Sequence, residues 1–185
     1  MDRPARIAVL IGSLRKDSYS RKLAHILMQL APAGMRFDEV PFRDLPLYDA
    51  DLESSVPAPW QQFRDRLQPA EALLFVTPEY NRSVPGGLKN ALDVGSRPAG
   101  KNVWRGKPAA VISGSTGGIG GFGANHALRQ SLVYLDVPAL PQPEAYVGNF
   151  ATLFDAEGRL TREDTRKFLT QFMAAFGAWI DRNRG

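Results

Sequence analysis

The amino-acid sequence predicts a three-layer α/β/α sandwich built on a doubly wound parallel β-sheet. Apolar segments of strand length alternate with segments of helical apolar spacing, giving five expected strands and five expected helices. The strongest apolar segments are continuous, which is typical of strands buried on both faces. Because a chain of 185 residues suits one domain, we expect a single domain over residues 1–185. This alternation favours a parallel sheet covered by helices on both sides.

The expected strands are rich in β-branched and aromatic residues. The segments RIAVLIG, ALLFVTPEY and PAAVISGS are the most apolar, so we expect them in the interior of the sheet. The segment RFDEVPF is polar enough to lie nearer an edge. In chain order, the strands are expected at residues 6–12, 36–42, 72–80, 108–115 and 144–148.

The expected helices repeat apolar residues every three or four positions. They are expected at residues 20–31, 60–70, 86–96, 124–136 and from 161 onward. Thr161 and Asp164 have the spacing of a capping box, which predicts the start of the last helix. The apolar stripe of that helix, expected to face the core, consists of Phe168, Leu169, Phe172, Met173, Phe176, Trp179 and Ile180.

The long segment 43–59 between the second strand and the second helix includes a cluster of three carboxylates. Asp49, Asp51 and Glu53 are candidates for an acid–base pair or a metal site. Because they lie among prolines in a solvated loop, we favour ordinary loop residues.

Composition excludes several classes of chemistry. The chain has no cysteine, which removes disulfides, thiolate catalysis and zinc–thiolate sites, and its two histidines are far apart in sequence, so no metal site is expected. No segment resembles a signal peptide or a membrane span, and we expect a soluble cytoplasmic protein. The formal charge of +4 is spread among acidic residues, which disfavours a nucleic-acid partner and fits ligands that carry phosphate.

Three chemically distinctive loops follow strands that we expect to be central. In an open α/β sheet, ligands bind beyond the carboxyl ends of the strands, where the strand order reverses. The segments 12–20, 77–87 and 113–123 satisfy this condition. We therefore expect these loops to meet at one edge of the sheet.

The first loop is suited to a single phosphate. It carries Ser13, Arg15, Ser18 and Ser20 just before a helix, whose first turn presents free N–H groups and the positive end of the helix dipole. It lacks the glycine–lysine pattern of a triphosphate loop and the glycine pattern of a dinucleotide crossing. A serine-rich helix cap is the alternative interpretation.

The other two loops are suited to a flat ring. Hydrogen bonds to a phosphate alone do not offset the free energy lost on association. The rest of the ligand must therefore be large and make contacts elsewhere. In the second loop, Tyr80 offers an aromatic face, and Gly86 and Gly87 permit close approach of the backbone. The third loop has six glycines between residues 114 and 123, so its backbone can lie against a ring edge.

These segments resemble a known family. The stretches GSLRKDSYSRKLA, TPEYNRSVPGGLKNALD and ALRQSLVYLD are similar to those of the NAD(P)H-dependent FMN reductases of flavodoxin-like fold, with bacterial quinone and chromate reductases as the nearest relatives. The resemblance implies a sheet of order 2-1-3-4-5. It also implies FMN as cofactor, NADPH or NADH as electron donor, and quinones, free flavin or chromate as acceptors.

The resemblance also implies the residues of the site. The cofactor-binding residues are Ser13, Leu14, Arg15, Ser18, Tyr19, Ser20, Pro78, Glu79, Tyr80, Asn81, Ser115, Thr116 and Gly117. No catalytic side chain is required, because the flavin carries the hydride chemistry. His126 lies near the third loop as a possible proton donor, although a surface or interface histidine is the favoured interpretation. Relatives commonly carry asparagine at Ser20, and aromatic residues at Arg82 and Val94.

Two alternative functions are considered beside the reductase, and a homo-oligomer is expected. A flavodoxin-type electron carrier would lack its own hydride chemistry, and a nucleic-acid or regulatory module would use the basic surface. The resemblance and the mixed surface of the helix at 124–136, with Arg129 and Tyr134, favour a homodimer or homotetramer. We expect residues of the segment 80–97 to lie against the partner chain.

Overall fold

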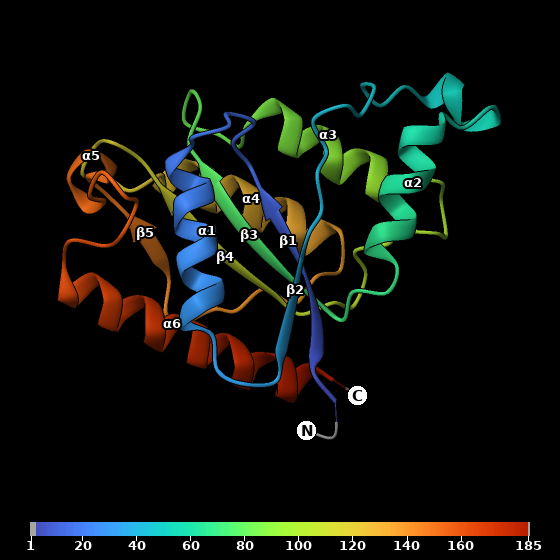
Figure 1. The fold of residues 1–185 in the computed structure, drawn as a ribbon. Coiled ribbons are helices and arrows are strands. Elements are labelled where there is room, and N and C mark those ends of the chain that lie inside the picture. The colour runs from blue at the N-terminus through green and yellow to red at the C-terminus, as the bar shows by residue number, and fades with distance from the viewer. Residues whose placement is uncertain (1–2, 185) are drawn as a thin grey trace.

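The computed structural model describes residues 3–184 and confirms the predicted fold class (Figure 1). Residues 1, 2 and 185 of the expected domain lie outside the described residues. The sheet has the order β2-β1-β3-β4-β5, and every neighbouring pair is parallel. The strands are β1 (Ala5–Ile11), β2 (Met35–Glu39), β3 (Ala72–Pro78), β4 (Ala109–Gly114) and β5 (Ala145–Val147).

The predicted contrast between central and edge strands is confirmed. All of β4 and nearly all of β3 are buried, whereas β2 at the edge alternates between half-buried and exposed positions. The strand β2 ends at Glu39, three residues before the predicted boundary. Val40 still donates its backbone N–H to the Val9 carbonyl at 3.0 Å, but Pro41 has no N–H with which to continue the ladder.

Helices cover both faces of the sheet. On one face, α1 and α6 pack with α5, and on the other, α2, α3 and α4 enclose Trp60 and Trp104. The helices are α1 (Tyr19–Leu30), α2 (Ala58–Leu67), α3 (Gly86–Gly95), α4 (Phe122–Tyr134), α5 (Phe150–Leu153) and α6 (Glu163–Asn183), with a 3₁₀ turn η1 (Ala50–Ser54). The short elements α5 and η1 were not predicted, because a single turn carries no measurable periodicity.

The predicted capping box at the start of α6 is wrong. The helix begins at Glu163 behind Arg162, and no side chain caps it. The hydroxyl of Thr161 instead donates to the carbonyl oxygens of Thr152 and Leu153 at 2.9 and 3.2 Å, which anchors the end of α5. The apolar stripe of α6 does face the core. Two of its members, Phe168 and Trp179, are only partly buried.

Two carboxylates of segment 43–59 serve the local structure. Asp49 caps η1 by accepting the backbone N–H of Asp51 at 3.0 Å. Glu53 accepts the hydroxyl of Tyr48 at 2.7 Å, and this hydrogen bond raises the pKa of Tyr48. Within residues 3–184, no group of three or more potential ligands could hold a metal ion. None of the helices in this part of the chain has the length and apolar character required to cross a membrane.

Candidate functional site

The three predicted loops meet at the carboxyl edge of the sheet. A cavity of about 190 Å³ is lined by residues from all three and by Phe150 of α5. Its lining consists of Ser13, Arg15, Ser18, Tyr19, Ser20, Pro78, Glu79, Tyr80, Gly114, Ser115, Thr116 and Phe150. The structure therefore brings together all of the predicted cofactor-binding residues except Leu14, Asn81 and Gly117.

A second cavity of about 420 Å³ adjoins the first and shares Arg15 and Tyr80 with it. Its lining consists of Gly12, Leu14, Arg15, Arg43, Tyr80, Pro85, Gly86 and Gly87. Leu14 belongs here, where it packs so closely on Gly87 that a Cβ at that position would lie 3.3 Å from Leu14 Cδ1. The two cavities therefore lie side by side along Arg15 and Tyr80, and together they form the candidate site.

The first loop combines a helix cap with an unpaired cation. Ser18 is the N-cap of α1, and its hydroxyl oxygen accepts the backbone N–H of Arg21 at 3.1 Å. The N–H groups of Tyr19 and Ser20 lie in the first helical turn, where no intrahelical acceptor exists. Within residues 3–184, the guanidinium of Arg15 has no hydrogen bond or ion pair. This end of the cavity is therefore positively charged and rich in free donors.

The second loop places Tyr80 at the entrance of the site. Tyr80 and Ser83 exchange two backbone hydrogen bonds of 3.0 Å, and between them Asn81 and Arg82 have φ values of 51° and 64°. These left-handed conformations close a tight hairpin turn, in which asparagine is tolerated better than most residues. Asn81 lies at the exposed tip of this turn, and Tyr80 is 46% exposed.

Glu79 ties the second loop to α4. Its Oε2 accepts the backbone N–H of Ala124 at 3.1 Å, and its Oε1 accepts Arg82 Nη1 at 3.1 Å. No side chain caps α4 at its N-cap Gly121, so Glu79 supplies an acceptor and a negative charge where the helix dipole is positive. The side chain is only 11% exposed. Glu79 thus fixes the wall of the cavity as well as lining it.

Backbone hydrogen bonds join the third loop to the segment 147–150. Ser115 donates its N–H to the Val147 carbonyl and accepts the N–H of Phe150 at its own carbonyl. The carbonyl of Gly117 accepts both the Ser115 hydroxyl at 3.0 Å and the backbone N–H of Asn149 at 3.1 Å. Gly117 therefore supports the loop from behind the cavity lining.

Phe150 is a lining residue that sequence reasoning missed. Its ring packs on the backbone of Gly114, where an added Cβ would lie 1.8 Å from Phe150 Cζ, and its centroid is 5.6 Å from that of Tyr19. The residue follows β5, whose carboxyl end reaches the same edge of the sheet as the other strands. Applying the rule for ligand sites to the last strand as well would have indicated it.

His126 does not line either cavity. Its Nε2 lies 2.9 Å from the hydroxyl oxygen of Tyr146, and its ring centroid is 4.2 Å from that of Phe122. Burial, followed by a hydrogen bond with Glu144, raises the pKa of Tyr146 to about 12. This geometry agrees with the interpretation of His126 as a surface or interface residue.

The site can hold an elongated ligand that is anionic at one end. Arg15 and the first turn of α1 form the cationic end, and Tyr80, Gly86 and Gly87 line the wider part. The surrounding residues contribute no histidine and no cysteine. The arrangement is therefore suited to binding and orienting a reactive group that the ligand itself brings.

Comparison with known proteins gives consistent matches. A family model described as NADPH-dependent FMN reductase matches residues 5–152. A quinone reductase of Pseudomonas putida KT2440 is 55% identical over 179 residues, covering 96% of each chain. A 2-hydroxy-1,4-benzoquinone reductase of a Burkholderia species is 48% identical, covering 95% of this chain and 96% of its own. The solved structure of the flavoenzyme NAD(P)H:(acceptor) oxidoreductase FerB of Paracoccus denitrificans has a TM-score of 0.90 at 42% identity, covering 97% of this chain and 98% of its own.

The contact between Glu79 and α4 can be tested by unfolding the ligand-free protein. We expect Glu79→Ala to lower the free energy of unfolding by about 0.5–2 kcal/mol, the usual effect of losing an N-terminal helix acceptor. Glu79→Gln keeps an acceptor oxygen and should lose less. Urea denaturation measures both changes. Unchanged stability of Glu79→Ala would show that the carboxylate does not hold the helix.

Proposed function

This chain belongs to the NADPH-dependent FMN reductase family, and we propose that it transfers electrons from NADPH or NADH through bound FMN to quinones. The observation that carries the proposal is a pair of adjoining cavities with an unpaired arginine and a helix N-terminus at one end, and an aromatic, glycine-lined space beside it. Two close relatives are named for quinone substrates. Free flavin and chromate are further candidate acceptors.

The residues of the site fit FMN. Arg15, the hydroxyls of Ser13 and Ser20 and the free N–H groups of α1 would hold the phosphate. Tyr80 and Pro78 on the second loop, with the backbone of the third loop, would hold the ring. When bound, FMN supplies the hydride and electron chemistry, and the protein supplies position and electrostatics.

No histidine or cysteine lines the two cavities, and Glu79 is the one carboxylate among their lining residues. Arg15 places permanent positive charge at the phosphate end, and a planar guanidinium matches phosphate geometry. Glu79 is already engaged by Ala124 and Arg82, so its role is to position the loop. A flavodoxin-type carrier is not favoured, because the relatives named above are reductases.

Mixing the protein with NADPH under anaerobic conditions tests the proposed function. The protein should purify with bound flavin, lose its yellow colour rapidly on addition of NADPH, and regain it when a quinone is added. A flavin that stays oxidised with both NADPH and NADH would contradict the proposal and favour an electron carrier. A protein that binds no flavin but shifts a DNA probe in a salt-dependent way would favour the nucleic-acid alternative.

The role of Arg15 can be tested with two related ligands. We expect Arg15→Ala to weaken FMN by about ten- to a hundredfold, because a charge-assisted hydrogen bond contributes about 1.5–3 kcal/mol. Riboflavin lacks the phosphate, and its affinity should barely change. Fluorescence titration of the ligand-free protein measures both. Lys16→Ala is the matched control, since Lys16 is an exposed cation of the same loop outside both cavities. Equal losses for FMN and riboflavin would mean that Arg15 is structural.

We also propose a homodimer or homotetramer, supported by exposed apolar residues on α4. Val133 and Tyr134 are 79% and 90% exposed, while Leu128 and Leu132 of the same helix are buried in the core. Arg129, predicted as an interface residue, bonds within the chain to Asn125 Oδ1 and the Leu140 carbonyl. The contact of segment 80–97 with a partner, the absence of nucleic-acid and membrane partners, and the cytoplasmic location remain predictions.

Light scattering at micromolar concentration tests the assembly. We expect a mass at least twice the 20.4 kDa of the chain, and a shift toward the monomer for Tyr134→Asp. Leu47→Asp is the matched control, because Leu47 is 77% exposed and lies in another part of the molecule. A monomeric mass for the wild type with full flavin occupancy would remove the proposed interface.

A further inference from the structure

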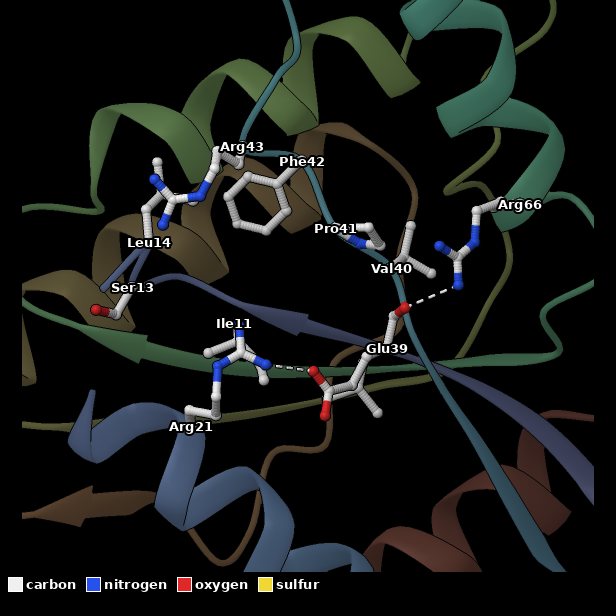
Figure 2. A pocket seen from close by; sticks show the side chains of 11 residues that line it. Ile11, Ser13, Leu14, Arg21, Glu39, Val40, Pro41, Phe42, Arg43 and Arg66 are labelled. Carbon is white, nitrogen blue, oxygen red and sulfur yellow. Dashed lines mark hydrogen bonds and ion pairs between the residues drawn. The ribbon is translucent and has the colours of Figure 1, made fainter. Parts of the chain in front are cut away.

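A third cavity, of about 270 Å³, lies beside the candidate site (Figure 2). Its apolar lining residues include Val9, Val40 and Phe42. Figure 2 shows Arg21, Arg43 and Arg66 around the cavity. It shares Leu14 and Arg43 with the 420 Å³ cavity, and Ser13 with the 190 Å³ cavity. A ligand in the candidate site could therefore continue past Arg43 into this third cavity.

The three arginines differ in how they are paired. Arg21 Nη1 donates to Glu39 Oε2 at 2.6 Å, and His25 Nε2 lies 2.7 Å from Glu39 Oε1, so both oxygens of this carboxylate are engaged. Arg66 Nη2 donates to Asp38 Oδ1 and to the Glu39 carbonyl at 2.7 and 2.9 Å. A guanidinium has five N–H donors, so Arg21 and Arg66 are oriented by these contacts and keep donors to spare.

Arg43 is the unpaired member of the group. Within residues 3–184 its guanidinium has no hydrogen bond or ion pair, and Figure 2 shows it beside Leu14, on the far side of the cavity from Arg66. Glu39 is the one carboxylate among the lining residues, against three arginines. Asp38, just outside the lining, pairs with Arg66, so the three arginines face two carboxylates and the unpaired positive charge is that of Arg43.

The charge and shape of the cavity indicate a phosphorylated nucleoside. A phosphate monoester carries a charge of about −1.5 to −2 at pH 7, and the unpaired Arg43 together with the spare donors of Arg21 and Arg66 offers it charge-assisted hydrogen bonds. The apolar lining residues suit a base. The volume lies below the roughly 300–1,000 Å³ of a complete small-molecule site, so the cavity fits one part of a longer ligand.

We infer that this cavity binds the adenosine 2′-phosphate half of NADPH and that Arg43 selects NADPH over NADH. The inference rests on the proposed function, in which the nicotinamide reaches the flavin through the adjoining cavity. NADH carries a hydroxyl in place of the 2′-phosphate. It would leave the guanidinium of Arg43 without a partner, while NADPH supplies a charge-assisted contact.

Calorimetric titration with two fragments tests the inference without turnover. The FMN-loaded protein should bind 2′,5′-ADP at least tenfold more tightly than 5′-AMP. Arg43→Ala should weaken 2′,5′-ADP by about ten- to a hundredfold, the effect of one charge-assisted hydrogen bond, and Arg43→Lys should recover part of the loss. Arg182→Ala, an exposed arginine on α6, is the matched control and should bind like the wild type.

Steady-state kinetics provide a second readout. We expect Arg43→Ala to raise KM for NADPH at least tenfold more than KM for NADH. Equal binding of 2′,5′-ADP and 5′-AMP to the wild type, or an equal rise of both KM values, would overturn the inference. If neither donor reduced the flavin, the proposed function would fail, and the titration with 2′,5′-ADP would still decide the inference by itself.

Discussion

The parallel register of β1, β3 and β4 is the constraint on which the rest of the structure depends. Ile11 pairs with Val76, and Pro78 pairs with Gly114, so the loops that follow the three strands emerge side by side. Gly12 strengthens this arrangement, because a Cβ there would lie 2.6 Å from Thr77 Oγ1 and would push the first two loops apart. A site assembled from segments some hundred residues apart in sequence thus follows from backbone hydrogen bonds in a buried sheet.

The arginines near the carboxyl edge of the sheet form two groups, one paired with acidic residues and one unpaired. Arg21 and Arg66 are held by acidic residues of β2, whereas Arg15 and Arg43 have no acidic partner in the described part of the chain. Unpaired cations that lie near one another repel, and a bound anion relieves this repulsion. Ligands that bind only the folded chain stabilise it by mass action. Occupancy by phosphate-bearing ligands and stability of the fold are therefore linked.

Much of the fold could be predicted because its signals are local. A continuous apolar run such as Leu73–Val76 is hard to place anywhere other than in a buried strand, and the loops after such strands were found in the same way. The errors come from tertiary contacts that no local sequence pattern encodes. Thr161 has the spacing of a helix cap, yet its hydroxyl bonds to Thr152 and Leu153. Phe150 gave no periodic signal, and only its packing on Gly114 makes it part of the site.

The attachment of the third loop to the segment 147–150 has a consequence for how this scaffold can diversify. Three of the contacts that hold the loop are between main-chain atoms: Ser115 N–H to the Val147 carbonyl, Phe150 N–H to the Ser115 carbonyl, and Asn149 N–H to the Gly117 carbonyl. Replacing Thr116 would change the chemistry of the cavity without removing any of these bonds. Natural or laboratory evolution can therefore alter the lining of this cavity at the third loop while the path of the loop stays the same.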